Sequence, residues 1–183
     1  MSPAVRSQLT GVEREFGADE IIVSKTDVHG RITYVNDVFV RVSQYSRAEL
    51  MGAAHSIIRH PDMPVEAFAD LWDYLKRGES WRGYVKNRRK DGGFYWVEAF
   101  ASPVRENGQV VGYESVRRRA DAATVKVVAR LYERFRNGRA GGLRIDNGQV
   151  VRTGLLGRIQ TMSMRARLSA AMAAILISVL AVG

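Results

Sequence analysis

Residues 80–119 read SWRGYVKNRRKDGGFYWVEAFASPVRENGQVVGYESVRRR, and this stretch decides the fold. It holds three runs rich in β-branched and aromatic residues, joined by DGG at 91–93 and ENG at 106–108. Both joints carry the glycine that a tight hairpin turn needs. The stretch therefore predicts three consecutive antiparallel strands.

The sequence before this stretch adds two strands and several helices. ADEIIVSKTDVHGRITYVND predicts strands at about 20–26 and 31–35 around the turn DVHG. Short helices follow, one of them capped by Ser46. VEAFADLWDYLK at 65–76 has apolar residues at helical spacing, and Gly78 ends it. This order predicts an α+β fold, a five-stranded antiparallel sheet with short helices and one longer helix on one face.

Composition limits the chemistry that the chain can perform. The 183 residues include no cysteine, which excludes disulfides, zinc-thiolate sites, iron-sulfur clusters and thiol nucleophiles. Residues 1–18 lack the apolar stretch of a secretory signal and are expected to form an N-terminal tail. No Ser/His/Asp set and no phosphate-binding loop can be identified, so we expect no enzyme activity.

The formal charge of +9 is concentrated in one part of the chain. Residues 117–167 hold 13 Lys and Arg against 3 acidic residues, whereas residues 1–116 are close to neutral. Residues 168–183, LSAAMAAILISVLAVG, are uncharged and would span roughly 24 Å as a helix, short of the ~30 Å hydrocarbon core. We expect 166–183 to begin a transmembrane helix, with a terminal helix buried against the domain as the alternative. The basic segment then suits an anionic membrane surface better than nucleic acid.

Between domain and membrane, the sequence predicts two further elements. Residues 121–138 have an apolar stripe at helical spacing and read as a helical linker that ends at Gly138. Residues 139–165 form a basic juxtamembrane segment, which contains a predicted hairpin around Asn147-Gly148, expected to dock the domain at the membrane. The pentapeptide NGQVV occurs in this hairpin and also at 107–111.

The hexapeptide RHPDMP at 59–64 places several polar groups just before the long helix. Arg59 and His60 would add hydrogen-bond donors to the free N–H groups of a helix N-terminus, a place suited to an anion such as a pyrophosphate. Asp62 would cap the helix or bond a ligand. In the purely structural alternative, the prolines fix the path of the chain and Asp62 is only a cap. No second histidine stands at metal-ligand spacing from His60.

The strand WRGYVKNRR offers a second set of candidate residues. Alternation places Trp81, Gly83, Val85 and Asn87 on one face, which we expect to be buried. A buried amide needs partners, and a flat ligand with ring donors and acceptors would supply them. Trp81 offers a stacking surface, and Gly83 leaves room for an approach to the sheet. The alternative is a core tryptophan with an asparagine bonded to backbone.

This order of elements resembles the PAS sensor domain over about residues 20–119, which places the domain at 19–120. DVHGRITYVNDVFVRVSQYSRAELMG, GESWRGYVKNRRKDGGFYW and ENGQVVGYESVR carry the resemblance. IIRHPDMP, AFADLW and VKNRRKDGGFYW resemble, more narrowly, the N-terminal domain of bacterial aerotaxis receptors. The resemblance implies FAD as cofactor, bound through Arg59, His60, Asp62, Trp81 and Asn87. It also implies a homodimer that controls a chemotaxis signalling domain and its kinase complex.

The expected function is therefore a redox sensor, anchored in the cytoplasmic (inner) membrane with its PAS domain on the cytoplasmic side. One alternative is a PAS domain that binds another small ligand, or that dimerises without flavin. A haem sensor with His60 as axial ligand is another. NRRKDGGFYW also resembles light-sensing LOV domains, but those need a cysteine beside the flavin, and this chain has none.

The arginines just before the apolar segment generate a topology prediction. Since positive residues stay on the cytoplasmic side, reporter fusions at residue 120 are expected to report a cytoplasmic location. A periplasmic signal would contradict both this orientation and the sensing of cellular redox state.

Overall fold

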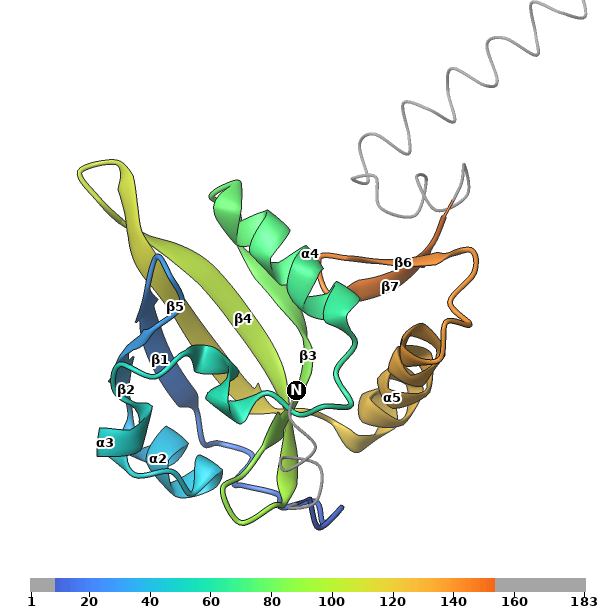
Figure 1. The fold of residues 1–183 in the computed structure, drawn as a ribbon, viewed down its shortest axis with the longest axis horizontal. Helices are drawn as coiled ribbons and strands as arrows, with labels where there is room; N and C mark the ends of the chain where they lie inside the picture. The colour runs from blue at the N-terminus through green and yellow to red at the C-terminus, as the bar shows by residue number, and fades with distance from the viewer. Residues whose placement is uncertain (1–8, 154–183) are drawn as a thin grey trace, which may run out of the picture.

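The computed structural model describes residues 9–153, and its centre is a five-stranded antiparallel sheet (Figure 1). Its order is β2-β1-β5-β4-β3, so the first and last strands of the domain are neighbours. The strands are β1 (Ile22–Asp27), β2 (Ile32–Val35), β3 (Trp81–Arg88), β4 (Phe94–Glu106) and β5 (Gln109–Arg119). The predicted α+β fold with a five-stranded antiparallel sheet is confirmed.

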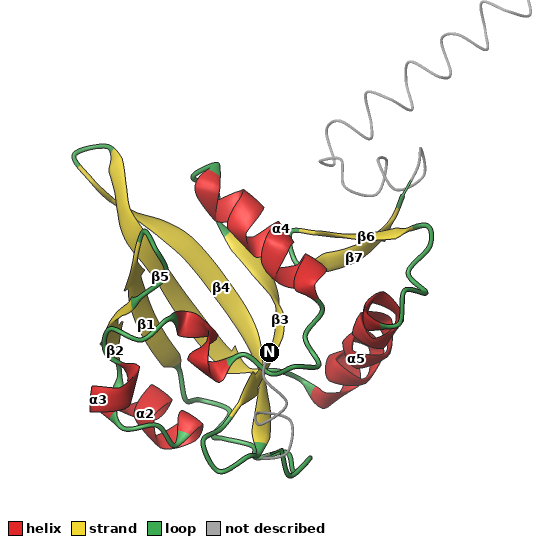
Figure 2. Ribbon diagram, in the orientation of Figure 1, coloured by secondary structure: helices red, strands yellow, loops and turns green. Residues whose placement is uncertain are grey.

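The helices between β2 and β3 cover one face of the sheet, as Figure 2 shows. They are α2 (Asp37–Ser43), α3 (Arg47–Leu50), the 3₁₀ helix η1 (His55–Ile58) and α4 (Val65–Lys76). Ser46 forms the expected capping box with Glu49, and Gly78 follows α4 with a φ of 76°. The expected cap by Asp62 is wrong, because Pro64 is the N-cap of α4 and no side chain bonds there.

A helix and a hairpin follow the sheet. Helix α5 (Ala122–Arg136) lies in the predicted linker range, and β6 (Leu143–Asp146) pairs with β7 (Gln149–Arg152). Tyr132 of α5 packs its ring 6.4 Å from that of Trp96, and its hydroxyl donates to the Tyr84 carbonyl at 3.0 Å. These contacts place α5 on the outer face of β3 and β4.

The segment before β1 is part of the folded domain from residue 9 onward, although we expect 1–18 to be a tail. Glu13 forms a parallel bridge with Phe94, and the Arg14 N–H donates to the Phe94 carbonyl at 2.7 Å. Phe16 is buried and meets Tyr95 edge to face. The sheet therefore gains a short extra contact at the start of β4.

Within residues 9–153, no helix is both long enough and apolar enough to cross a membrane. The expected membrane segment at 166–183 lies outside the described residues.

The side chain of Asn36 joins β1 to the start of α2 and generates a stability prediction. Its Oδ1 accepts from the N–H groups of Val23 and Phe39, both at 3.1 Å, and its Nδ2 donates to the Ile21 carbonyl at 2.8 Å. Asn36→Ala removes all three bonds and should lower the free energy of unfolding by about 2 kcal/mol. Urea unfolding measures this, with Thr33→Ala, an exposed change, expected within about 0.5 kcal/mol of wild type. Equal stability of both variants would contradict the role of Asn36.

Candidate ligand-binding site

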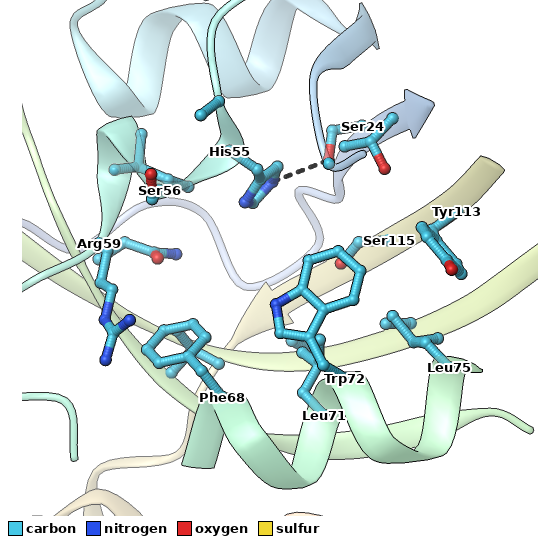
Figure 3. Close-up of a pocket in the computed structure, with 18 of the residues that line it drawn as sticks. Ser24, His55, Ser56, Arg59, Phe68, Leu71, Trp72, Leu75, Tyr113 and Ser115 are labelled. Carbon is cyan, nitrogen blue, oxygen red and sulfur yellow. Dashed lines mark hydrogen bonds between the residues drawn. The ribbon is translucent and has the colours of Figure 1, made fainter. Parts of the chain in front are cut away.

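A cavity of about 490 Å³ lies between the inner face of the sheet and the helices η1 and α4. Strands β1, β3, β4 and β5 form its floor. Figure 3 shows Phe68 and Trp72 extending from α4 into this space, with His55 on the opposite side. Its volume falls in the ~300–1,000 Å³ range of small-molecule sites.

Most of the cavity wall is apolar. On α4 the wall consists of Val65, Phe68, Ala69, Leu71, Trp72 and Leu75. The Trp72 ring meets that of Tyr113 on β5 nearly perpendicularly, with centroids 5.4 Å apart. On β4, the small side chains of Ala99 and Ala101 face the cavity and help to leave its volume open. Such walls suit a flat, largely apolar ring system.

The cavity wall carries a buried arginine. Only 2% of Arg117 is exposed, and no carboxylate of the described residues forms a salt bridge with it. Its Nε donates to Ser115 at 3.0 Å, and its Nη2 lies 2.9 Å from His55 Nε2 and also bonds Ser24. Burial lowers the pKa of Arg117 to about 10, so the group stays protonated at neutral pH.

The imidazole of His55 complements this charge as a neutral group. Burial, assisted by the charge of Arg117, lowers the pKa of His55 to about 3. A neutral ring can accept a hydrogen bond from the guanidinium at Nε2. Ser24 Oγ is 3.3 Å from the same nitrogen (Figure 3). The three side chains form a polar network at the cavity wall.

Two buried donors at the cavity have no hydrogen-bond partner among the described residues. They are Nδ2 of Asn87 and Nη1 of Arg117. Leaving a buried polar group unbonded costs about 1–3 kcal/mol. Such groups in a native fold therefore point to an acceptor outside residues 9–153.

The structure brings Arg59 and Asn87, two of the five predicted site residues, to this cavity. Residues 59 and 87 form an isolated antiparallel bridge, so their backbones lie side by side. The Arg59 guanidinium stands 3.9 Å above the Phe68 ring, and partial burial lowers its pKa. Arg59 thus contributes a cation to the cavity wall.

His60 and Asp62 do not line the cavity. Burial, with the nearby charge of Lys86, lowers the pKa of His60 to about 4, so His60 is neutral at pH 7. Its Nδ1 accepts from the Asp62 N–H at 3.1 Å. The Asp62 carboxylate pairs with Lys86 at 2.7 Å and with Arg136 of α5 at 2.8 Å. These two residues fix the hexapeptide and connect it to α5.

Trp81 lies on the predicted face of β3 but outside the cavity wall. It is 1% exposed, and its Nε1 donates to Asp70 of α4 at 2.7 Å. A Cβ on Gly83 would lie 2.3 Å from the Trp81 ring and 3.1 Å from the Gly148 Cα. The space that we expect to admit a ligand beside Gly83 is therefore filled by the chain itself.

Sequence reasoning missed Arg117, His55 and Ser24. A signal was present for Arg117, because alternation along β5 places it on the same face as Tyr113 and Ser115. The run of three arginines at 117–119 conceals this signal, because all three look like the start of the basic stretch at 117–167.

A family model described as the PAS fold matches residues 32–117. Residues 32–117 form a PAS domain. The cavity of this PAS domain lies between its central sheet and the helices that connect β2 to β3.

The PAS domain is similar to parts of larger curated proteins. Over 149 residues the chain is 47% identical to the aerotaxis receptor of Escherichia coli (strain K12), a match that covers 81% of this chain and 29% of the receptor. The resemblance to the aerotaxis-receptor type is thereby confirmed. A nitrogen fixation regulatory protein of Klebsiella pneumoniae is 30% identical over 118 residues, 64% of this chain and 23% of that protein.

Solved structures agree on the fold. A light-oxygen-voltage domain studied with a flavin analogue superposes with a TM-score of 0.54 at 24% identity, covering 62% of this chain and 85% of that one. At this identity, the likeness supports the PAS fold alone.

His55 and His60 generate a pH prediction. His55 and His60 have pKa values of about 3 and about 4 in the folded state, against about 6.5 in an unfolded chain. Between these values the unfolded chain binds more protons, so the free energy of unfolding should fall as pH drops below about 6.5. Urea unfolding at a series of pH values measures the loss, which should be smaller in His55→Gln. A His55 ring signal in NMR that titrates above pH 6 would contradict the neutral imidazole.

Proposed function

We propose that this PAS domain binds FAD in the cavity and acts as the redox-sensing module of a membrane-anchored chemoreceptor. The observation that carries the proposal is the pair of unpartnered donors, Asn87 Nδ2 and Arg117 Nη1, at the wall of a mostly apolar cavity. The isoalloxazine ring of a flavin is flat and apolar over its faces, and it presents nitrogen and carbonyl acceptors along one edge.

The residues present fit such a cofactor. Asn87 and Arg117 would bond the acceptors of the ring, and the aromatic side chains of α4 would pack against its faces. Arg59, at the N-terminal side of α4, would hold the phosphate portion through its forked donors. His60 and Asp62 would act indirectly by fixing the segment that carries Arg59, and Trp81 by its bond to Asp70.

A flavin supplies electron-transfer chemistry, and the protein tunes and reads it. The protonated Arg117 would interact more strongly with such a ring in its reduced, more electron-rich form. The hydrogen bonds of Arg117 to His55 and Ser24 would then readjust, and with them the contacts of η1 with the sheet. This readjustment would convert a redox change into a change of shape without enzyme catalysis.

The similarity to the aerotaxis receptor supports the cellular setting of the proposal. The module would lie on the cytoplasmic side of the inner membrane, as part of a homodimer, and would act on a chemotaxis signalling domain and its kinase complex. A PAS domain that binds another small ligand, or that dimerises without flavin, is the competing function. A purified protein with the yellow absorbance of flavin would decide between them.

Substitutions at the cavity wall generate a binding prediction. Asn87→Leu and Arg59→Ala should each weaken FAD binding roughly tenfold to a hundredfold, the loss of one charged or buried hydrogen bond. Arg77→Ala is the matched control, because Arg77 also stacks on an aromatic ring, that of Tyr74 at 4.4 Å, but lies outside the cavity wall. Flavin stoichiometry and titration of the apoprotein measure the effect.

Stability of the flavin-free variants separates a ligand role from a structural one. Because the Asn87 Nδ2 bonds nothing among residues 9–153, Asn87→Leu should leave the melting temperature of the apoprotein unchanged or raised. Full flavin content in both cavity variants would place the cofactor elsewhere.

A further inference from the structure

The pentapeptide NGQVV forms two turns in very different surroundings. In both, the Asn and Gly have positive φ angles, 49° and 82° at Asn107-Gly108 and 47° and 69° at Asn147-Gly148. A Cβ on Gly108 would meet nothing within 4 Å. A Cβ on Gly148 would lie 2.1 Å from the Arg82 carbonyl oxygen. The first turn is free, and the second is docked on β3.

One carboxylate, that of Asp70 on α4, holds this docked turn. It accepts from the backbone N–H groups of Asn147 at 3.1 Å and Gly148 at 2.8 Å, and from the Trp81 Nε1 at 2.7 Å. Hydrogen bonds to an ionised acceptor are roughly twice as strong as neutral ones. A further bond, from the Arg82 N–H to the Asn147 Oδ1 at 3.1 Å, closes the contact.

Two more contacts fasten the hairpin to the domain. The Tyr74 hydroxyl on α4 donates to Asp146 at 2.7 Å, and Ile145 of β6 is buried in the domain core. Burial and the bond to Asp146 raise the pKa of Tyr74 to about 12, so its hydroxyl is a stable donor. The turn end of the β6–β7 hairpin thus lies against α4, and Figure 1 shows the two strands extending away from the helix.

Helix α4 therefore faces the cavity on one side and contacts the hairpin on another. Phe68, Ala69, Leu71 and Trp72 line the cavity, while Asp70, in the middle of the same turns, holds the hairpin. A helix moves as a unit, so a shift that the cavity imposes on α4 displaces the Asp70 carboxylate as well. Even a small displacement of this carboxylate would weaken its hydrogen bonds to the N–H groups of Asn147 and Gly148.

We propose that Asp70 is a clasp which links occupancy of the cavity to docking of the β6–β7 hairpin, so that each stabilises the other. The inference goes beyond the proposed function, because it needs only that a ligand contact α4 from the cavity side. Linkage requires the effect to be reciprocal: the factor by which ligand favours docking equals the factor by which docking favours ligand.

The first measurement is hydrogen exchange of the hairpin amides in the full 183-residue chain. Gly148→Ala and Asp70→Asn should speed exchange at residues 143–152 by about tenfold or more, relative to β4 amides in the same sample. Gly108→Ala, the same change in the free copy of the pentapeptide, should leave the hairpin protected. Asp73→Asn, an exposed acid on the same helix, is the control for charge.

The second measurement is the affinity for FAD. Gly148→Ala touches no residue of the cavity wall, yet it should weaken FAD binding at least about fivefold, and Gly108→Ala should not. In the wild type, FAD should slow exchange of the hairpin amides by the same factor. A third variant, Trp72→Ala, loosens α4 from the cavity side and should speed hairpin exchange without any ligand.

Each possible outcome supports or overturns the clasp or its linkage to the cavity. Protected hairpin amides in Gly148→Ala would overturn the clasp, and a freed hairpin with unchanged FAD affinity would overturn the linkage. If the wild type binds no FAD, the proposed function fails, and Trp72→Ala then decides: faster hairpin exchange supports the linkage, and unchanged exchange overturns it.

Discussion

The packing of α4 across the inner face of the sheet is the contact on which the other features depend. Large side chains of α4, among them Phe68 and Trp72, reach toward strands that present Ala99 and Ala101. Large side chains on the helix facing small ones on the sheet leave space between the two, while α4 stays in contact through the Asp70 bond to Trp81 and the Trp72–Tyr113 contact. The cavity is the space that this arrangement encloses.

A buried cation sets the electrical character of that space. Arg117 is held by neutral acceptors, Ser24, Ser115 and His55, none of which cancels its charge. In a low-dielectric surrounding, a charge of this kind acts strongly on whatever lies next to it. The cavity wall is therefore mostly apolar but carries positive charge, a combination that favours an electron-rich ring over a neutral hydrocarbon.

Local patterns predicted the fold, and long-range contacts explain what they missed. The hairpins, the helix at 65–76 and the inward face of β3 with Asn87 follow from turn residues and periodicity over a few positions. Asp62 was expected to act on the adjacent helix, but its carboxylate is taken by Lys86 and by Arg136, which lies 74 residues further along the chain. The indole N–H of Trp81 is likewise already used, in its hydrogen bond to Asp70. No spacing rule reports such partners, because they depend on how α4 and the segment before it pack against β3 and on how α5 returns to the sheet.

The short stretch of chain between α5 and β6 is fixed at both ends. Arg136, paired with Asp62, anchors the end of α5, and the docked hairpin begins at Leu143. Between these two anchors, Gly138, Gly141 and Gly142 have nothing within 4 Å of where a Cβ would lie. Lengthening a flexible loop costs only about 0.6 kcal/mol per doubling of its length. Residues 137–142 are thus a natural insertion point, where a fluorescent or affinity tag could be added while the anchors keep both flanking elements in place.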